Sequence, residues 1–482
     1  MHRLTNLDTS FLRLEKPDAP MHVGGTMIFD APADKPMTFE RLKAHIQARL
    51  PTARVFRERL LMPALPLENP SWVADQPVDL DAHMTHVQVR GPIEPAALRD
   101  LANEFFSEVL PRDRPLWNLL YIDEAPVRRG VRQTNPGRFA VLLKVHHAAV
   151  DGVSAEAVLS GLLDPTPTPR VMPPDTWEPQ APVAREPLAR SLRNAARSAG
   201  LRELADTAGT LGKRFIKRAL DPQEKNIPYY FRAPHSTLNV PISESRVFPS
   251  AHLSLPAIKQ VRRACEGSTV NDVVLAVCGG ALRLYLQETG ALPEASLVAM
   301  APISRRAAEN KHQQGNQVSS MLVALATEID DPLVRLARIT KGTRVAKAYN
   351  RDMTIEALFD ALPEGSPALF LGAWTRLNLS RRTPPMFNAV VTNVPGSPVP
   401  LYLDGARMQS LTGMAGIYDG VGLTMVVTSY ADTLTIGITS TPEVLSSPQR
   451  FVTCLHQALA ELVAEAAVLQ EAEPVPVPDS VR

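Results

Sequence analysis

Hydrophobic and polar positions follow two kinds of pattern in the first part of the chain. Residues 36–50 and 92–110 have helical patterns of apolar and charged positions. Residues 117–123 and 138–145 are short apolar runs, partly β-branched, which are typical of strands. Because helices and strands alternate here, we expect an α/β fold.

The last part of the chain continues this mixture. Residues 268–290 predict a helix that begins at a Ser or Thr cap. Residues 423–430 and 433–440 predict two strands joined by a short turn. An amphipathic helix is predicted from residue 447, and residues 467–482 are expected to form a disordered tail.

Prolines separate the two parts. Residues 164–187 hold too many prolines for a helix or a central strand, so an extended linker is predicted. A chain of 482 residues is also too long for one compact core. The predicted organisation is an N-terminal domain over 1–163, a linker region over 164–245 and a C-terminal domain over 246–466.

Residues 185–218, inside the linker region, combine an excess of arginine and lysine with an apolar side rich in leucine. A basic amphipathic helix of this kind could lie on an anionic membrane or lipid surface. It could equally be a solvated connector that packs its leucines on the body of the protein.

Composition limits the classes of partner and compartment. The net charge of +1 gives the protein no long-range electrostatic attraction to nucleic acid, so no nucleic-acid partner is expected. The three cysteines lack metal-ligand spacing, and the N-terminus lacks the apolar core of a secretory signal. No segment reaches 18 consecutive apolar residues. We therefore expect a cytoplasmic protein that meets a membrane only at its surface.

Two adjacent histidines follow the strand predicted at 138–145. Consecutive strand side chains point to opposite faces, so only one of His146 and His147 can face a given cleft. Imidazole is suited to take a proton from an alcohol near neutral pH. Asp151 could orient a ring or hold the loop through an arginine, and Gly152 permits a turn or the close approach of a substrate.

Other chemistries fit these residues less well. Adjacent histidines rarely bind one metal ion, and the sequence has no HExxH motif, so no metal is expected. Ser154 lacks the second glycine of a GxSxG elbow, and no cysteine stands in a recognisable reactive setting. Direct transfer with a histidine base is favoured over a covalent enzyme intermediate.

The motif HHxxxDG at 146–152 is that of acyltransferases built like chloramphenicol acetyltransferase and of peptide-synthetase condensation domains. From about Leu4 to Val463, the chain resembles the bacterial wax ester synthase/diacylglycerol acyltransferase family. The matching segments are LTNLDTSFLRLEKPDAPMHVGGTMIFD from Leu4, RDRPLW from Arg112, VNDVVLA from Val270, GNQVSSMLVAL from Gly315 and VVTNVPGSPVPLYLDGARM from Val390. Ser397 departs from this pattern, since the family often has proline there.

The resemblance implies two chloramphenicol-acetyltransferase-like (CoA-dependent acyltransferase) α/β domains, joined by a long crossover linker, with the active site at their interface. It implies an O-acyltransferase that moves a long-chain acyl group from acyl-CoA to diacylglycerol or a fatty alcohol, making triacylglycerol and wax esters. Acyl-CoA would be a co-substrate, with no permanently bound cofactor. The enzyme would be peripheral on the inner membrane or on lipid inclusions. The oligomeric state is left open.

The resemblance also assigns roles to residues. His147 would be the general base, and His146 would be partly dispensable. Asp151 would pair with an arginine away from the substrate, and Gly152 would permit the turn. Asn271 would donate to the oxyanion of the intermediate, although helix capping or a core hydrogen bond would also explain it.

Substrate binding is assigned to two further groups of residues. The first is the motif Pro115, Leu116 and Trp117. The second is Asn393, Pro395 and Gly396, for which packing beside the active site is the alternative. Residues 405–414 could line an acyl channel.

Two other functions stay open on the sequence alone. One is a condensation enzyme that depends on a carrier protein, against which the absence of neighbouring carrier or adenylation sequence argues. The other is a non-catalytic coat protein of lipid inclusions, which would have no use for an intact HHxxxDG motif.

Overall fold

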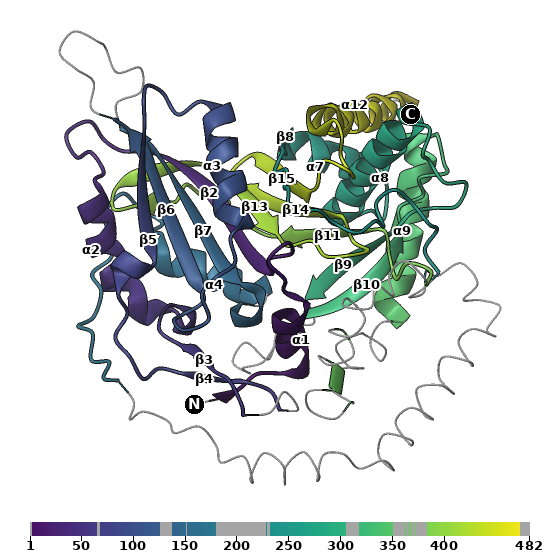
Figure 1. Ribbon diagram of the computed structural model, residues 1–482. Helices are drawn as coiled ribbons and strands as arrows, with labels where there is room; N and C mark the ends of the chain where they lie inside the picture. The colour runs from purple at the N-terminus through teal and green to yellow at the C-terminus, as the bar shows by residue number, and fades with distance from the viewer. Residues whose placement is uncertain are drawn as a thin grey trace, which may run out of the picture.

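The computed structural model describes residues 2–64, 68–125, 137–150, 152–179, 228, 232–304, 318–349, 362, 366–367, 371 and 383–472. Two α/β lobes stand side by side, each built on a six-stranded sheet (Figure 1). A small three-stranded sheet of β1 (His2–Arg3), β4 (Ser71–Val73) and β3 (Arg59–Leu61) lies below the N-terminal lobe. The predicted two-lobed α/β fold is confirmed.

The sheet of the N-terminal lobe has the order β12-β13-β2-β7-β6-β5. Its first four strands along the chain are β2 (His22–Asp30), β5 (Met84–Val89), β6 (Trp117–Glu124) and β7 (Arg138–His146). Helix α2 (Phe39–Arg49) packs its apolar side on one face of this sheet, and α3 (Pro95–Ser107) packs on the other. The helices and strands predicted here are confirmed.

Both faces of β7 are buried, which explains its continuous apolar sequence. Phe139 and Val141 belong to the core under α2, whereas Ala140 and Leu142 belong to the core under α3. A strand that is covered on both sides loses the polar alternation of a surface strand. Its end is thereby held rigidly inside the lobe.

The sheet of the C-terminal lobe has the order β10-β9-β11-β14-β15-β8. Its strands are β8 (Ser250–Ser254), β9 (Val298–Ser304), β10 (Val318–Ala324), β11 (Ala389–Val394), β14 (Leu423–Tyr430) and β15 (Thr433–Ser440). Its helices are α7 (Leu255–Ala264), α8 (Val270–Glu288), α9 (Pro332–Tyr349) and α12 (Pro448–Ala472). The strand pair at 423–440 is antiparallel, and Thr269 caps α8, both as predicted.

Two strands from the C-terminal part of the chain belong to the N-terminal sheet. Strands β12 (Tyr402–Leu403) and β13 (Ala406–Ala415) lie in the predicted C-terminal domain, yet β13 pairs with β2 in the N-terminal sheet. The range 246–466, predicted as the C-terminal domain, therefore contributes two strands to the N-terminal sheet. A strand pattern shows which residues are extended, but the partner strand depends on backbone contacts that the pattern does not contain.

Glycines allow β13 to cross close to the C-terminal sheet. A Cβ atom at Gly437 in β15 would lie 1.9 Å from the carbonyl oxygen of Gly413 in β13. A Cβ atom at Gly413 would lie 2.6 Å from Cγ1 of Val426 in β14. Only a residue without a side chain permits this approach, so the glycines set the spacing between the lobes.

The first part of the linker is fastened to the N-terminal lobe. Asp164 is buried and accepts a hydrogen bond from Arg49 at 2.6 Å. Arg57 pairs with Asp175 and lies over the ring of Trp177, 4.8 Å from its centroid. Residues 165–179 form no helix or strand, as predicted for this stretch, and the basic segment 185–218 lies outside the described residues.

Helix α12 runs further than predicted. The expected disordered tail began at residue 467, but α12 continues to Ala472. Residues 467–472 contain alanine, leucine, glutamine and glutamate, which favour a helix, and Pro474 follows just beyond.

Within the described residues, one helix, Pro448–Gln470, has the length and apolar composition needed to cross a membrane. It packs against α7, α8 and α9 in this structure.

We expect Gly437→Ala to lower the free energy of unfolding by about 1–3 kcal/mol, because the added methyl group overlaps the Gly413 carbonyl. Gly342→Ala in α9 is the matched control, since no atom lies within 4 Å of its added Cβ. It should raise the free energy of unfolding by about 0.5–1 kcal/mol through helix propensity. Urea denaturation measures both, and equal stability of the Gly437 variant and the wild type would contradict the close approach.

Candidate active site

A cavity of about 600 Å³ lies between the two lobes. Strands β2, β7 and β13 line it from the N-terminal sheet, and β11 and β14 line it from the C-terminal sheet. Its wall is mostly apolar, with contributions from Val23, Met27, Val145, Met408, Leu411 and Met414. Such a lining suits an apolar ligand that carries few polar groups.

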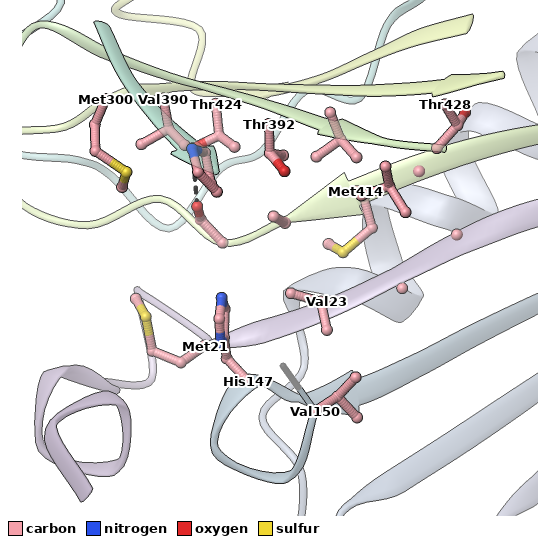
Figure 2. Close-up of a pocket in the computed structure, with 18 of the residues that line it drawn as sticks. Met21, Val23, His147, Val150, Met300, Val390, Thr392, Met414, Thr424 and Thr428 are labelled. Carbon is pink, nitrogen blue, oxygen red and sulfur yellow. Dashed lines mark hydrogen bonds between the residues drawn. The ribbon is translucent and has the colours of Figure 1, made fainter. Parts of the chain in front are cut away.

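His147 enters this cavity from the N-terminal side. It begins the short 3₁₀ turn η4 (His147–Ala149) directly after β7, and its backbone N–H donates to the carbonyl of Met21 at 2.8 Å. The imidazole stacks on Phe11 of α1 (Asn6–Leu14), with ring centroids 3.9 Å apart. Nδ1 is buried, so Nε2 is the nitrogen that can face the cavity (Figure 2).

His146 points the other way and is fully buried. Its Nδ1 accepts a hydrogen bond from the backbone N–H of Ala148 at 3.0 Å, and its Nε2 lies 3.2 Å from a carboxylate oxygen of Glu15. Because Nδ1 accepts a hydrogen bond, Nε2 is the nitrogen that carries a hydrogen, and this nitrogen faces the Glu15 carboxylate. The predicted division, with one histidine facing the cleft and one away from it, is confirmed.

Glu15 connects His146 to the rest of the site. Its carboxylate also accepts from Arg112 at 2.9 Å and from the backbone N–H of Met21 at 3.3 Å. Burial alone would raise the pKa of Glu15, but hydrogen bonds and charges from His146 and Arg112 outweigh burial and lower this pKa to about 2. Glu15 is therefore a carboxylate at neutral pH.

A second buried group supports the strand behind the histidines. Lys144 donates to the carbonyls of Phe105 and Glu108, and His22 bonds the same Glu108 carbonyl at 2.8 Å. Burial lowers the pKa of Lys144 to about 8. Burial and the charge of Lys144 lower the pKa of His22 to about 3, so His22 is neutral.

Sequence reasoning missed Glu15, His22 and Lys144. Glu15 and His22 fall in the N-terminal segment that matches the family, which was the available signal. Nothing in the sequence alone shows that Glu15 reaches His146, since the two residues are far apart along the chain.

The other residues of the motif are only partly described. Asp151 lies outside the described residues, so its predicted ion pair stays a prediction. Gly152 begins helix α4 (Gly152–Leu162) directly after the motif loop.

Asn271 lies in the first turn of α8, but it is not the cap. Thr269 and Asp272 form the capping box, and the Asn271 side-chain oxygen accepts from Asn393 at 3.3 Å. Neither asparagine lines the cavity. The geometry favours the core hydrogen bond over the predicted oxyanion role for Asn271, and it gives Asn393 no contact with the cavity.

The motif Pro115, Leu116 and Trp117 does not line the cavity either. Leu116 and Trp117 are fully buried, and the Trp117 indole donates to the carbonyl of Phe56 at 3.2 Å. The Leu116 carbonyl accepts from the backbone N–H of His146 at 2.9 Å. The predicted substrate contact of this motif stays a prediction. The motif packs the core beneath the histidine turn.

Pro395 and Gly396 do line the cavity, at the end of β11. So do Met408, Leu411, Gly413 and Met414 from the segment predicted as an acyl channel. Within the described residues, no group of three or more His, Cys, Asp or Glu side chains could hold a metal ion.

Comparison with known proteins gives a consistent result along the chain. The family model described as wax ester synthase/diacylglycerol acyltransferase catalytic domain matches residues 4–274, and the WS/DGAT C-terminal domain matches residues 314–463. A putative diacyglycerol O-acyltransferase from Mycobacterium tuberculosis is 34% identical over 95% of this chain and 99% of its own length. The O-acyltransferase WSD from Acinetobacter baylyi is 31% identical over 95% of this chain and 96% of its own length.

Solved structures agree with these relatives. The wax ester synthase/diacylglycerol acyltransferase from Marinobacter aquaeolei VT8 superposes with a TM-score of 0.67 at 30% identity, covering 97% of this chain and 100% of that one. The first condensation domain of the CDA synthetase superposes with a TM-score of 0.54 at 16% identity, covering 100% of this chain and 98% of that one. The second likeness concerns the fold alone.

We expect Glu15→Gln to lower the free energy of unfolding by about 3 kcal/mol at pH 7, because the pKa of Glu15 is about 2 against an ordinary 4.5. A depressed pKa stabilises the folded protein above the unfolded-state pKa. The difference between wild type and variant should therefore shrink as the pH falls from about 4.5 toward 2. Urea denaturation between pH 7 and pH 3 measures this.

Glu40→Gln is the matched control, because the Glu40 side chain is 81% exposed. Its effect should stay within about 0.5 kcal/mol at every pH. A Glu15→Gln effect that did not change with pH would contradict the buried carboxylate.

Proposed function

Because this chain belongs to the wax ester synthase/diacylglycerol acyltransferase family, and is therefore an acyl-CoA-dependent O-acyltransferase, we propose that acyl transfer takes place in the interlobe cavity with His147 as the general base. The observation that carries this proposal is the position of His147 at the cavity wall, in the HHxxxDG motif. Imidazole has the basicity that removal of an alcohol proton requires near neutral pH.

The proposed reaction is a direct transfer within a ternary complex. Nε2 of His147 takes the hydroxyl proton while the alcohol oxygen bonds to the thioester carbonyl carbon. The electrons of the C=O double bond move to the oxygen and form an oxyanion. When the double bond re-forms, the C–S bond breaks and the CoA thiolate takes the proton from His147. The products are an ester and free CoA.

The shape and lining of the cavity support long apolar substrates. A largely apolar cavity of about 600 Å³ favours a fatty acyl chain and an acceptor whose hydroxyl sits on an apolar body. Diacylglycerol and long-chain alcohols both have this form. The names of the M. tuberculosis and M. aquaeolei proteins support proposing both as acceptors, with triacylglycerol and wax esters as products.

His146 and Glu15 have a positioning role in this proposal. The turn that carries His147 is held by the Ala148–His146 hydrogen bond, by the contact between His146 and Glu15, and by the stacking of Phe11. A base fixed in one orientation avoids the cost of reorganisation during the reaction. This role explains why a second histidine would be useful without touching the substrate.

We expect His147→Ala to lower kcat by about 10²–10⁴-fold, because the general base is lost. His146→Ala should lose less, since it disturbs only the orientation of the turn. The measurement is CoA release from palmitoyl-CoA by purified enzyme, with hexadecanol or dioleoylglycerol as acceptor.

Release that depends on an acceptor and disappears in His147→Ala supports the proposal, and the ratio of the two acceptors gives the main product. Equal losses in the two histidine variants would contradict the separate roles. Folded wild-type protein that releases no CoA with either acceptor would favour the carrier-dependent or coat-protein alternatives.

We further propose a cytoplasmic location, peripheral on the inner membrane or on lipid inclusions. Substrates with long apolar chains partition into lipid, so an enzyme that uses them gains from lying on a lipid surface. The basic and apolar composition of residues 185–218 supports such contact.

Deletion of residues 185–218 should reduce the binding of the protein to anionic liposomes, because basic residues and an apolar side are lost together. Flotation of full-length and deleted protein with phosphatidylserine-containing and neutral vesicles measures this. CoA release by the deleted protein in detergent shows that it is still folded. Unchanged flotation on the anionic vesicles would reject the membrane role of this segment.

A further inference from the structure

Most polar side chains that line the cavity already donate hydrogen bonds to other groups of the protein. Hydroxyl and amide groups of the lining donate to backbone carbonyls: Ser10 to Asn6, Thr424 to Gly416, Thr428 to Leu411, Tyr430 to Met408, and Asn239 to Phe387 and Gly420. A group committed in this way cannot donate to a substrate without breaking its own bond.

Thr392 is different. It lies on β11 between Val390 and Val394, and all three residues line the cavity. Its hydroxyl makes no hydrogen bond with any residue in the part of the chain that the structure describes. Ser160 also has no hydrogen bond to its hydroxyl there, but Ser160 is exposed to solvent at the end of α4. The Thr392 hydroxyl is thus available to donate a hydrogen bond to a ligand in this mostly apolar cavity.

The position of Thr392 relative to His147 suits catalysis. Figure 2 shows the imidazole rising from the N-terminal lobe, while the Thr392 hydroxyl points down from the C-terminal sheet into the same space. Asn393, the next residue, faces Asn271 of α8 instead. The alternation of a strand therefore puts the threonine, and not the asparagine, on the cavity wall.

We propose that Thr392 is a catalytic residue whose hydroxyl donates a hydrogen bond to the thioester carbonyl oxygen as that oxygen becomes an oxyanion. This inference rests on the proposed function, because it needs acyl transfer in this cavity. The hydroxyl keeps its proton throughout and releases the oxygen when the C=O double bond re-forms and CoA leaves. His147 alone moves the proton from the alcohol to the CoA sulfur.

The surroundings of Thr392 fit this task. β11 is paired with β14 through Thr392 and Val426, so the backbone is fixed before the substrate arrives. The β-branched side chain has restricted χ1 freedom, which limits the positions of the hydroxyl. In a cavity with a mostly apolar wall, a fixed donor stabilises developing negative charge more strongly than it would in water.

Thr392→Val tests the proposal, because valine keeps the shape and removes only the hydroxyl. We expect kcat for palmitoyl-CoA with hexadecanol to fall about 10²–10³-fold, the loss typical of one oxyanion donor. The KM for palmitoyl-CoA should change less than about threefold, since the ground-state carbonyl carries little charge. Thr392→Ser should recover kcat to within about tenfold of the wild type, because the hydroxyl is restored.

Thr435→Val is the matched control. Thr435 is a buried threonine of β15 in the same sheet, does not line the cavity, and pairs with His252. Its kcat should stay within about twofold of the wild type. Thermal unfolding and the Kd for palmitoyl-CoA are measured for each variant, so that a folding or binding defect is separated from a loss in the chemical step.

The outcomes are distinct. A Thr392→Val enzyme that binds palmitoyl-CoA normally and keeps kcat within about threefold of an active wild type would overturn the role of Thr392 alone. Loss of kcat in both Thr392→Val and Thr392→Ser, with normal binding and folding, would also overturn it. An inactive wild type, or an active His147→Ala, would overturn the proposed function itself.

Discussion

The contact between buried His146 and Glu15 fixes the geometry on which the rest of the site depends. β7 ends at His146, and strand alternation then decides that His147 faces the cavity. Glu15 caps the C-terminus of α1, the helix whose Phe11 stacks on the His147 ring. One carboxylate therefore connects the end of the strand, the helix and the turn that carries His147. The pKa of Glu15, lowered to about 2, keeps this carboxylate charged over the whole physiological range.

The two lobes complete the site together. The N-terminal lobe supplies His147, and the C-terminal sheet supplies the opposite wall of the cavity. Strand β13 joins them, because it pairs with β2 in one sheet and passes close to the other at Gly413 and Gly437. Because β13 belongs to one sheet and packs closely against the other, it sets the spacing between the two walls of the cavity.

Local patterns predicted much of this fold. The apolar runs at 117–123 and 138–145 became β6 and β7, and the Thr269 cap began α8, because these features depend on neighbouring residues. The exchange of β13 and the reach of Glu15 to His146 could not be predicted in this way, because each joins residues distant in sequence. The HHxxxDG motif singled out His147, which lines the cavity. The PLW motif did not reveal that Trp117 would be buried in the core.

The same limit applies to the oxyanion donor. Asn271 is prominent in the sequence as part of the ND motif, yet its side chain bonds Asn393 away from the cavity. Thr392 has no sequence feature that marks it out. It differs from its neighbours Thr424 and Thr428 because their hydroxyl groups donate to backbone carbonyls within the described residues, whereas its hydroxyl does not. Only the arrangement of the side chains in space distinguishes these two candidates.

Direct acyl transfer between two substrates bound together, with His147 as base, leaves no acyl group on the protein. Exchange of labelled CoA into palmitoyl-CoA, measured without an acceptor, therefore distinguishes it from a covalent mechanism. We expect no exchange until hexadecanol or dioleoylglycerol is added, because no acyl-enzyme forms. Rapid exchange in the absence of any acceptor would contradict direct transfer, since the acyl group would then have to leave CoA for the protein first.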